Sequence, residues 1–213
     1  LVKRVKDAGL LVTSSATSVA EARWLEDHGC DVVIAQGNEA GGHRGMFLND
    51  DIARQAGTMA LVPQVVDAVT VPVIAAGGIG DGRGIAAALA LGAAGVQIGT
   101  AFLLSPEART SALHREQAND NSTTLTNVFT GRPARGIVNR YIREVGPMSA
   151  EAPQFPLAAG ASQPMRTAAE AKGSPDFTPL WSGQAPTFAR EMPTVELIAT
   201  LVEDTEAVMK RLT

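Results

Sequence analysis

Residues 71–84 read VPVIAAGGIGDGRG, and this stretch decides the fold. The uninterrupted apolar run at 71–76 is typical of a parallel strand that is covered on both faces. Gly77 and Gly78 end the run, and Asp81 can cap the helix that follows. The stretch therefore predicts a buried strand, a tight glycine turn and a helix in direct succession, which is one βα unit.

The same alternation of strand and helix patterns extends on both sides over the first hundred residues. Short apolar runs alternate with stretches rich in Ala, Leu and Glu that have helical character. Strands are expected near 10–14, 31–36, 71–76 and 95–99. Ser18 and Glu21 have the spacing of a capping box, and Ser105-Pro106-Glu107 favours another helix start. Four βα units and the parallel sheet of an α/β protein are predicted.

The composition and the hydrophobic pattern change after residue 118. Residues 146–186 are rich in Pro, Gly, Ala and Ser, with a short helical patch at 165–171, and a last helix is expected from Thr194 to about Leu212. Two regions are therefore predicted. Residues 1–118 carry the βα units, and residues 119–213 form an appended, mainly helical or irregular extension on the substrate side.

Composition excludes several classes of protein. Of the 213 residues, 45% are hydrophobic, which is ample for a core and excludes a disordered chain. The formal charge is 18 − 22 = −4, so no basic excess favours nucleic-acid binding. Every apolar run is too short for a membrane span. The single Cys30 excludes an intramolecular disulfide and fits a reducing compartment, so a cytoplasmic protein is expected.

Two glycine-bearing strand ends predict a phosphate site. Ligands of parallel α/β folds bind beyond the carboxyl ends of the strands. Gly77-Gly78 ends one expected strand, and residues 95–100, GVQIGT, end the next, where Thr100 can donate to a phosphate. Tight helix–strand packing is the alternative for residues 95–100. The glycine spacing after residue 78 does not fit a dinucleotide fingerprint, which excludes a Rossmann site.

A third strand end carries His43. Residues 35–45 read AQGNEAGGHRG, and so many glycines let a backbone lie against a flat or phosphorylated ligand. A histidine at a strand end can move a proton near neutral pH; a solvated loop histidine is the alternative. His28 is expected to be solvated or capping, and His114 to lie on a solvated helix face. Cys and His are too few for a structural zinc site, so no metal is expected.

Five segments closely resemble the nitronate monooxygenase family, formerly called 2-nitropropane dioxygenase. They are 33–45 (VIAQGNEAGGHRG), 71–84, 95–103 (GVQIGTAFL), 129–136 (FTGRPARG) and 180–184 (LWSGQ). The resemblance covers nearly the whole chain. It implies an FMN-dependent TIM barrel with an extra helical domain after the last strand.

The resemblance also implies a set of site residues and a reaction. His43 would stand beside the flavin N5, and Gln36 and Gly41 would lie near the flavin. The FMN phosphate would be held by Gly78, Gln97, Ile98, Gly99 and Thr100, with Gly77 beside it. The substrates would be an alkyl nitronate and O₂, and the products a carbonyl compound and nitrite. With a neutral nitroalkane His43 would abstract the α-proton; with a nitronate it would orient or stabilise the anion.

The sequence departs from the family pattern at two places. The opening strand and A-P-M-x-G loop of the barrel are not matched, so the four strands correspond to the last four, and the chain is expected to be the C-terminal half of a (β/α)8 barrel. Open sheet edges would favour a homo-oligomer. Some members carry tyrosines and a lysine in the substrate lid, whereas Tyr141 is the single tyrosine here and Phe155 and Gln163 fall in that region. Substrate choice stays open.

Two alternative functions are kept. One is an FMN-dependent NAD(P)H reductase of the same superfamily, of the enoyl-ACP reductase or NADH:quinone reductase type, which shares a Glu-x-Gly-Gly-His-like loop. The other is a truncated, inactive fragment that no longer binds flavin. Gln36-Gly37 and the LWSGQ segment at 180–184 favour the monooxygenase.

Overall fold

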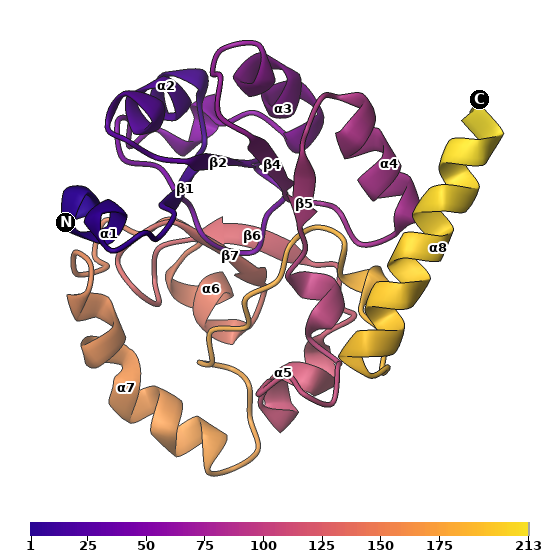
Figure 1. Ribbon diagram of the computed structural model, residues 1–213. Helices are drawn as coiled ribbons and strands as arrows, with labels where there is room; N and C mark the ends of the chain where they lie inside the picture. Colours follow the sequence, from indigo (N-terminus) through magenta and orange to yellow (C-terminus); the bar gives the residue numbers. More distant parts are fainter. Residues whose placement is uncertain (213) are drawn as a thin grey trace. The chain divides into compact units, whose positions relative to one another are not determined.

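The computed structural model describes residues 1–212, whose elements follow each other along the chain in Figure 1. The helices are α1 (Val2–Asp7), α2 (Val19–Asp27), α3 (Thr58–Val66), α4 (Gly82–Ala90), α5 (Ala112–Gln117), α6 (Arg140–Val145), α7 (Leu157–Glu170) and α8 (Thr194–Leu212). The strands are β1 (Thr13–Ala16), β2 (Val32–Gln36), β3 (Gly42–His43), β4 (Val73–Ala76), β5 (Gly95–Gln97), β6 (Thr123–Thr126) and β7 (Ala134–Ile137). Short 3₁₀ helices are η1 (Ile52–Arg54), η2 (Thr100–Phe102) and η3 (Pro186–Phe188).

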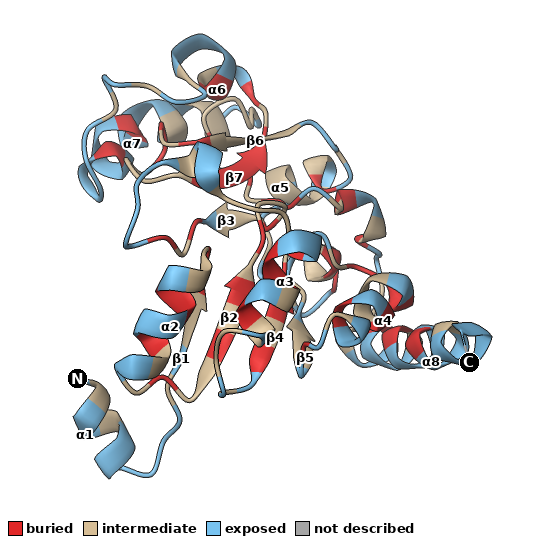
Figure 2. Ribbon diagram, turned by 90° about the horizontal axis from the view of Figure 1, so that it is seen from above, coloured by how far each residue is buried: buried red, intermediate tan, exposed pale blue. Residues whose placement is uncertain are grey.

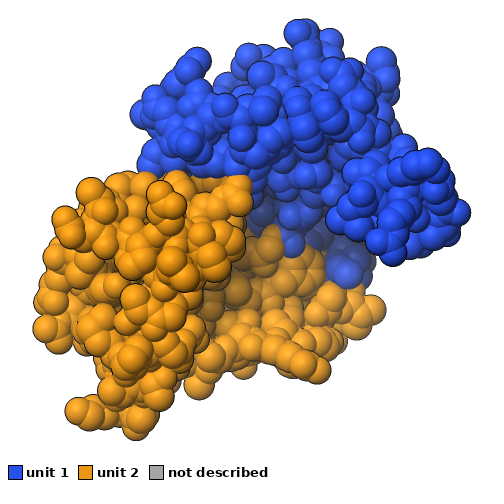
Figure 3. All heavy atoms as spheres, turned by 90° about the vertical axis from the view of Figure 1, so that its left-hand side faces the viewer, with its two compact units in different colours: residues 1–40, 45–98, 198–213 blue, residues 41–44, 99–197 orange. Residues whose placement is uncertain are grey.

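Contacts divide the described chain into two compact units, which Figure 3 colours separately. Unit 1 comprises residues 1–40, 45–98 and the end of the chain from 198; unit 2 comprises residues 41–44 and 99–197. Residues 99–118 thus group with the region that follows them. The sequence predicted a boundary at residue 118, with the βα units before it and a substrate-side extension after it. These roles of the two regions stay a prediction.

Unit 1 is built on a four-stranded parallel sheet in the order β1-β2-β4-β5. This confirms the prediction of an α/β protein with a parallel sheet. The first strand begins later than expected, at Thr13, and Leu10 and Leu11 are exposed. Ala16, Ala35 and Ala75 are fully buried and face each other across three neighbouring strands.

The core of unit 1 lies between the sheet and its helices. Val33 and Val73 from the strands meet Leu61, Val62 and Val65 of α3 in one buried cluster. Figure 2 shows the buried residues concentrated on the strands and on the sheet-facing sides of the helices. The face that carries Val33 and Val73 is buried, whereas Ile34 and Ile74 on the other face are only half-buried, so the expected cover on both faces is incomplete among the described residues.

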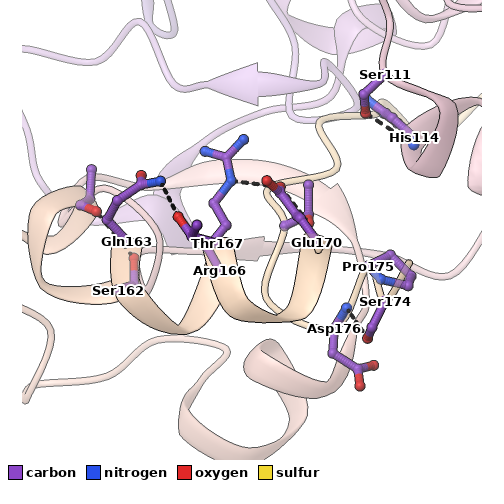
Figure 4. Close-up of polar contacts among 12 residues, drawn as sticks. Ser111, His114, Ser162, Gln163, Arg166, Thr167, Glu170, Ser174, Pro175 and Asp176 are labelled. Atoms are coloured by element: carbon purple, nitrogen blue, oxygen red, sulfur yellow. Dashed lines mark hydrogen bonds and ion pairs between the residues drawn. The ribbon is translucent and has the colours of Figure 1, made fainter. Parts of the chain in front are cut away.

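Unit 2 contains a three-stranded antiparallel sheet in the order β3-β7-β6. The sequence pattern did not predict β6 and β7, which lie in the region 119–213 that was expected to be mainly helical or irregular. The small core beside this sheet comprises Val128, Phe129 and Ile142. Figure 4 shows the polar contacts of α7, where Glu170 accepts hydrogen bonds from Arg166 and from the Thr178 hydroxyl and so ties the following turn to the helix.

One predicted helix start is wrong. Ser105-Pro106-Glu107 begins no helix, and α5 instead begins after Ser111, whose hydroxyl accepts from the His114 N–H at 3.3 Å. The Glu107 carboxylate accepts from the N–H and hydroxyl of Thr194, at 3.1 and 3.0 Å. The Glu107 carboxylate therefore binds Thr194, which is distant in the sequence, instead of the first turn of a local helix.

A buried carboxylate fixes the chain after the His43 loop. The Glu21 N–H donates to the Ser18 hydroxyl at 3.2 Å, which is half of the predicted capping box. The Glu21 side chain does not return to Ser18. It is 1% exposed and accepts from the N–H groups of Thr17 and Phe47 at 2.7 Å, and from that of Leu48 at 3.1 Å. Burial raises the pKa of this carboxyl, but the hydrogen bonds from Phe47, Thr17 and Leu48 outweigh burial and lower it.

We expect Glu21→Gln to lower the free energy of unfolding at pH 7 by about 2–3 kcal/mol, because the buried N–H groups lose a charged acceptor. The lowered pKa means that the wild-type carboxylate stabilises the fold above its unfolded pKa and loses this effect as pH falls through the folded value. Urea titrations at pH 7 and pH 3 should therefore show a smaller gap between the two proteins in acid. An equal gap at both pH values would contradict the assignment.

No helix within residues 1–212 is both long enough and apolar enough to cross a membrane.

Candidate functional site

The carboxyl ends of three parallel strands meet at one edge of the sheet in unit 1. Gln36 at the end of β2 pairs with Ala76 of β4, and Ala76 pairs with Gln97 of β5. Gly77 and Ile98 are the next residues along their strands. The register therefore brings together the strand ends that the sequence marked as a ligand site.

A threonine and a glutamate fix the turn after β4. The Glu39 carboxylate accepts from the Thr58 N–H at 2.8 and 3.0 Å, at the first residue of α3, where the helix dipole favours a negative charge. The buried Thr58 hydroxyl lies 2.8 Å from the Gly77 carbonyl oxygen and 2.9 Å from Glu39 Oε2. Sequence reasoning missed this pair as site residues, because the two lie 19 positions apart and no local pattern connects them.

The turn itself requires glycine at both positions. Gly77 has a φ of +117°, and a Cβ there would lie 2.8 Å from the Thr58 hydroxyl oxygen. Gly78 has a φ of +71°, and its Cβ would lie 3.3 Å from the Glu39 Cβ. Within residues 1–212, no hydrogen bond uses the N–H of either glycine. Exposed N–H donors in a turn that side chains cannot enter fit a phosphate group.

The helix after this turn contributes less to an anion site than expected. The Asp81 carboxylate accepts from the N–H groups of Arg83 and Gly84, at 3.1 and 3.0 Å. Burial raises the pKa of this carboxyl, but the hydrogen bonds from Arg83 and Gly84 and the Arg83 charge outweigh burial and lower it. An ionised side chain therefore already occupies the first turn of α4. The donors for a phosphate are the loop N–H groups rather than this helix end.

Gln36 fixes the far end of the His43 loop. Its Oε1 accepts from the Gly45 N–H at 2.7 Å. A Cβ on Gly45 would lie 2.6 Å from the Cβ of Ser15, so only glycine at position 45 lets the backbone lie this close to β1. Gln36 thus has a structural partner at the strand end in addition to its expected place near a flavin.

In unit 2 the loop runs as a short strand beside β7. Gly42 pairs with Arg135 and His43 pairs with Ala134. A Cβ on Gly41 would lie 2.6 Å from the Gly183 nitrogen, so protein packing alone accounts for glycine at position 41.

Side chains of unit 2 lie around the His43 ring. Its Nε2 lies 2.9 Å from the Thr130 hydroxyl oxygen. The ring centroids of Trp181 and Phe155 lie 5.6 and 6.1 Å from that of His43. Although the residue as a whole is exposed, removal of water from the ring lowers its pKa, and the positive charge of Arg132 lowers the pKa further. The imidazole is therefore neutral at pH 7, the form that can accept a proton.

Residues around His43 come from two of the segments that resemble the family, 129–136 and 180–184. The FTGRPARG segment supplies Thr130 and Arg132, and the LWSGQ segment supplies Trp181. Gly136 ends the first motif, and a Cβ there would lie 2.8 Å from the Leu180 carbonyl oxygen and 3.1 Å from Trp181 Cε3. Sequence reasoning quoted both motifs but did not assign Thr130 or Trp181 to the site, since their proximity to His43 depends on the antiparallel sheet.

Gly99 and Thr100 also belong to unit 2. The Thr100 hydroxyl oxygen accepts from the Gly183 N–H at 2.9 Å, and its own proton remains able to be donated. The space where a Gly99 Cβ would stand is open, so packing among the described residues does not account for glycine there.

The other two histidines and the cysteine differ in their surroundings. His28 is exposed, and its Nδ1 lies 2.7 Å from the Trp24 carbonyl oxygen at the end of α2, as expected for a solvated capping residue. Cys30 is buried, as expected. The expectation for His114 is wrong, because its ring is partly buried and donates to the backbone of Trp181. That partner comes from a segment 67 positions later, which helix periodicity cannot reveal.

The predicted site residues therefore form two groups, each defined within its own unit. Gln36, Gly77, Gly78, Gln97 and Ile98 line the strand ends of unit 1. Gly41, His43 and Thr100 are connected through residues 180–183 of unit 2.

A parallel α/β sheet with a phosphate-type turn, together with a neutral histidine in a glycine loop, defines a class of small-molecule-binding α/β proteins. The family model described as nitronate monooxygenase matches residues 1–204, and the chain belongs to that family.

Individual relatives agree with this assignment. A probable nitronate monooxygenase of Staphylococcus saprophyticus is 43% identical over 216 residues, which cover 99% of this chain and 61% of the relative. The structure of nitroalkane oxidase from Streptomyces ansochromogenes matches with a TM-score of 0.91 at 40% identity, over 100% of this chain and 62% of that one. FabK from Thermotoga maritima matches with a TM-score of 0.80 at 32% identity, over 98% and 65%. The chain spans about three fifths of the curated relative's length.

Proposed function

We propose that this chain is part of an enzyme that oxidises alkyl nitronates, and the corresponding nitroalkanes, to a carbonyl compound and nitrite, with FMN as cofactor and O₂ as the second substrate. The observation that carries the proposal is His43, a neutral imidazole held by Thr130 and Trp181 in the loop that resembles the family. Membership of the nitronate monooxygenase family and the similarity to nitroalkane oxidase support it.

The barrel architecture belongs to this proposal. The four parallel strands are taken as the last four strands of a (β/α)8 barrel, because their order in the sheet follows their order in the chain. Among the described residues, β1 and β5 each pair on one side only. A homo-oligomer that protects these edges stays a prediction.

The strand ends of unit 1 fit the phosphate of FMN. Gly77 and Gly78 would donate their N–H groups, and Gln97 and Ile98 stand at the neighbouring strand end. Gly99 and Thr100, which follow directly in the sequence, would complete the phosphate contacts. Gln36 and Gly41 would lie near the flavin ring. The bound flavin supplies the redox chemistry, and the protein supplies orientation and proton transfer.

His43 moves the proton that a neutral nitroalkane must lose. The Thr130 hydroxyl oxygen lies 3.1 Å from the Arg132 carbonyl oxygen and 2.9 Å from His43 Nε2, and so holds the imidazole in place. The α-proton passes to the neutral imidazole, and the positive charge of Arg132 favours the nitronate anion that forms. A substrate supplied as nitronate needs no proton transfer, and His43 then orients the anion.

The pH dependence of the reaction follows from the histidine. For a neutral nitroalkane, kcat/KM should rise with pH as His43 loses its proton, and the midpoint of this rise should lie below the ordinary histidine value of about 6.5, because the pKa of His43 is lowered. Arg132→Gln should move this limb to higher pH, since it removes a positive charge that disfavours the imidazolium. Initial rates from pH 5 to 8 test both statements. A limb that stays in place or moves to lower pH in the variant would exclude the charge effect.

An NAD(P)H-dependent flavin reductase is the second candidate, and the similarity to FabK is the observation that favours it. The two candidates differ in what reduces bound flavin in the absence of oxygen. Anaerobic mixing of the FMN-loaded chain with NADH or with a nitronate, followed by flavin absorbance, separates them. Rapid bleaching by the nitronate alone supports the proposal; rapid bleaching by NADH alone supports the reductase.

The inactive-fragment alternative is tested by the first step of the same experiment. The chain is mixed with FMN, free flavin is removed, and flavin absorbance is compared with protein concentration. Near-stoichiometric flavin followed by nitrite release from a nitronate supports the proposal. A colourless protein identifies a fragment that does not hold the cofactor.

A further inference from the structure

The Arg115 side chain of α5 binds the main chain of the segment that follows β5. Its Nη1 donates to the carbonyl oxygens of Leu103 and Ser105, at 3.3 and 3.2 Å, and its Nη2 donates to that of Leu104 at 2.6 Å. The three carbonyls are consecutive along the chain, and all of these residues belong to unit 2. One guanidinium therefore holds three successive carbonyl groups, which its planar fork of donors makes possible.

The bound carbonyls end a helical turn that begins at the proposed phosphate contacts. This turn, residues 99–105, contains η2 and is here called the η2 turn. The Phe102 N–H donates to the Gly99 carbonyl oxygen at 3.0 Å, and the Leu103 N–H donates to that of Thr100 at 3.1 Å. The Ser105 N–H continues the series by donating to the Phe102 carbonyl oxygen at 3.1 Å. Gly99 and Thr100 thus begin the turn that Arg115 holds at its other end.

The end of the η2 turn depends on this one side chain. Among residues 1–212, no backbone N–H donates to the carbonyl oxygen of Leu103 or of Leu104. Loss of the guanidinium would leave both carbonyls without their protein partner, which carries a free-energy cost in a partly buried position. A cation is also favoured at the carbonyl end of a helical turn. We therefore expect the conformation of the η2 turn to loosen without Arg115.

The Thr100 hydroxyl is oriented by a second contact in the same unit. Its oxygen accepts from the Gly183 N–H at 2.9 Å, so its proton points elsewhere and remains able to be donated. This contact fixes the hydroxyl only while the Thr100 backbone keeps its place. The backbone position is set by the η2 turn, so the direction of the Thr100 donor follows from the bonds that Arg115 makes.

We propose that Arg115 is a positioning residue for the cofactor phosphate: by holding the carbonyls of residues 103–105, it keeps Gly99 and Thr100 in the arrangement that contacts the phosphate. The inference rests on the FMN assignment in the proposed function. It assigns no contact of Arg115 with FMN or with substrate.

The cofactor offers a direct way to separate this role from general stability. Riboflavin has the same ring system as FMN but carries no phosphate. A loosened η2 turn should weaken the phosphate contacts and leave the ring contacts in place. Loss of Arg115 should therefore reduce the affinity for FMN and not the affinity for riboflavin, whereas a collapsed site would lose both.

The test compares Arg115→Met with Arg115→Lys by equilibrium titration with FMN and with riboflavin. Methionine keeps an apolar stem without donors, and we expect it to weaken FMN binding about tenfold while riboflavin binding changes less than about twofold. Lysine keeps the charge, but its single ammonium cannot reproduce the fork that spans three carbonyls. It should recover only part of the lost FMN affinity. Turnover at saturating FMN should match that of the wild type in both variants.

Arg109→Met is the matched control, because it removes one positive charge from an exposed arginine in the segment between η2 and α5. It should leave the FMN affinity unchanged. Equal losses of FMN and riboflavin affinity in Arg115→Met, full recovery by lysine, or wild-type FMN affinity in Arg115→Met would each overturn the proposal. The binding readout is independent of turnover. A selective loss of FMN affinity in a chain that releases no nitrite would therefore uphold the positioning role and reject the proposed reaction.

Discussion

Replacement of His43 by Asn is expected to lower kcat/KM for a neutral nitroalkane by about 10²–10⁴-fold, which is the usual contribution of a positioned general base. Asparagine cannot accept a proton at neutral pH. Asparagine keeps a polar group beside Thr130. The loop that follows β2 should therefore stay in place, including its hydrogen bond between the Gly45 N–H and Gln36 Oε1. FMN affinity should be unchanged.

The pre-ionised substrate separates the two parts of this effect. The same variant should lose much less activity with an alkyl nitronate, since no proton has to be removed. Initial rates for both substrate forms, with FMN fluorescence quenching as a binding control, test the prediction. His28→Asn is the matched control, because it replaces an exposed histidine of unit 1. Equal losses on both substrates would remove His43 as the base.

Gly78→Asp is expected to weaken FMN binding about 100-fold, equivalent to roughly 2.7 kcal/mol. The new carboxylate would stand at the turn whose N–H groups fit the phosphate, and it would add a second negative charge beside Glu39. The backbone φ of +71° disfavours side chains and adds strain.

Two further variants separate charge from strain. Gly78→Ala introduces the strain without the charge and should weaken binding much less. Gly9→Asp adds the same side chain at a φ of +73° where a Cβ has open space, and it should leave FMN affinity unchanged. Equilibrium titration with FMN measures all three. Wild-type affinity in a folded Gly78→Asp protein would contradict the phosphate assignment.

The parallel sheet could be predicted because its information is local. The strands of a parallel sheet have uninterrupted apolar sequences, and glycines mark their ends, as in residues 71–78. The antiparallel sheet could not be predicted in this way. Its strands β6 and β7, with the sequences TTLT and ARGI, are short and polar, and Arg135 is 5% exposed. Their pairing depends on tertiary context rather than on local propensity.

The same distinction applies to the candidate site. Glycines and His43 stand out in the sequence because backbone conformation and proton transfer require those residue types. Glu39 and Thr58 act through a contact over 19 positions, and Trp181 reaches His43 only through β7. His114 shows the limit most clearly, since its place in the run LHREQ indicated solvent, whereas its ring bonds to Trp181. Supporting residues of this kind are visible only once the sheets are assembled.

Aerobic nitrite release from an alkyl nitronate by the FMN-loaded chain tests the central proposal most directly. The account predicts nitrite in proportion to the nitronate consumed, with turnover that requires bound FMN, and little nitrite from a neutral nitroalkane once His43 is Asn. Stoichiometric FMN without any nitrite from the nitronate would contradict it.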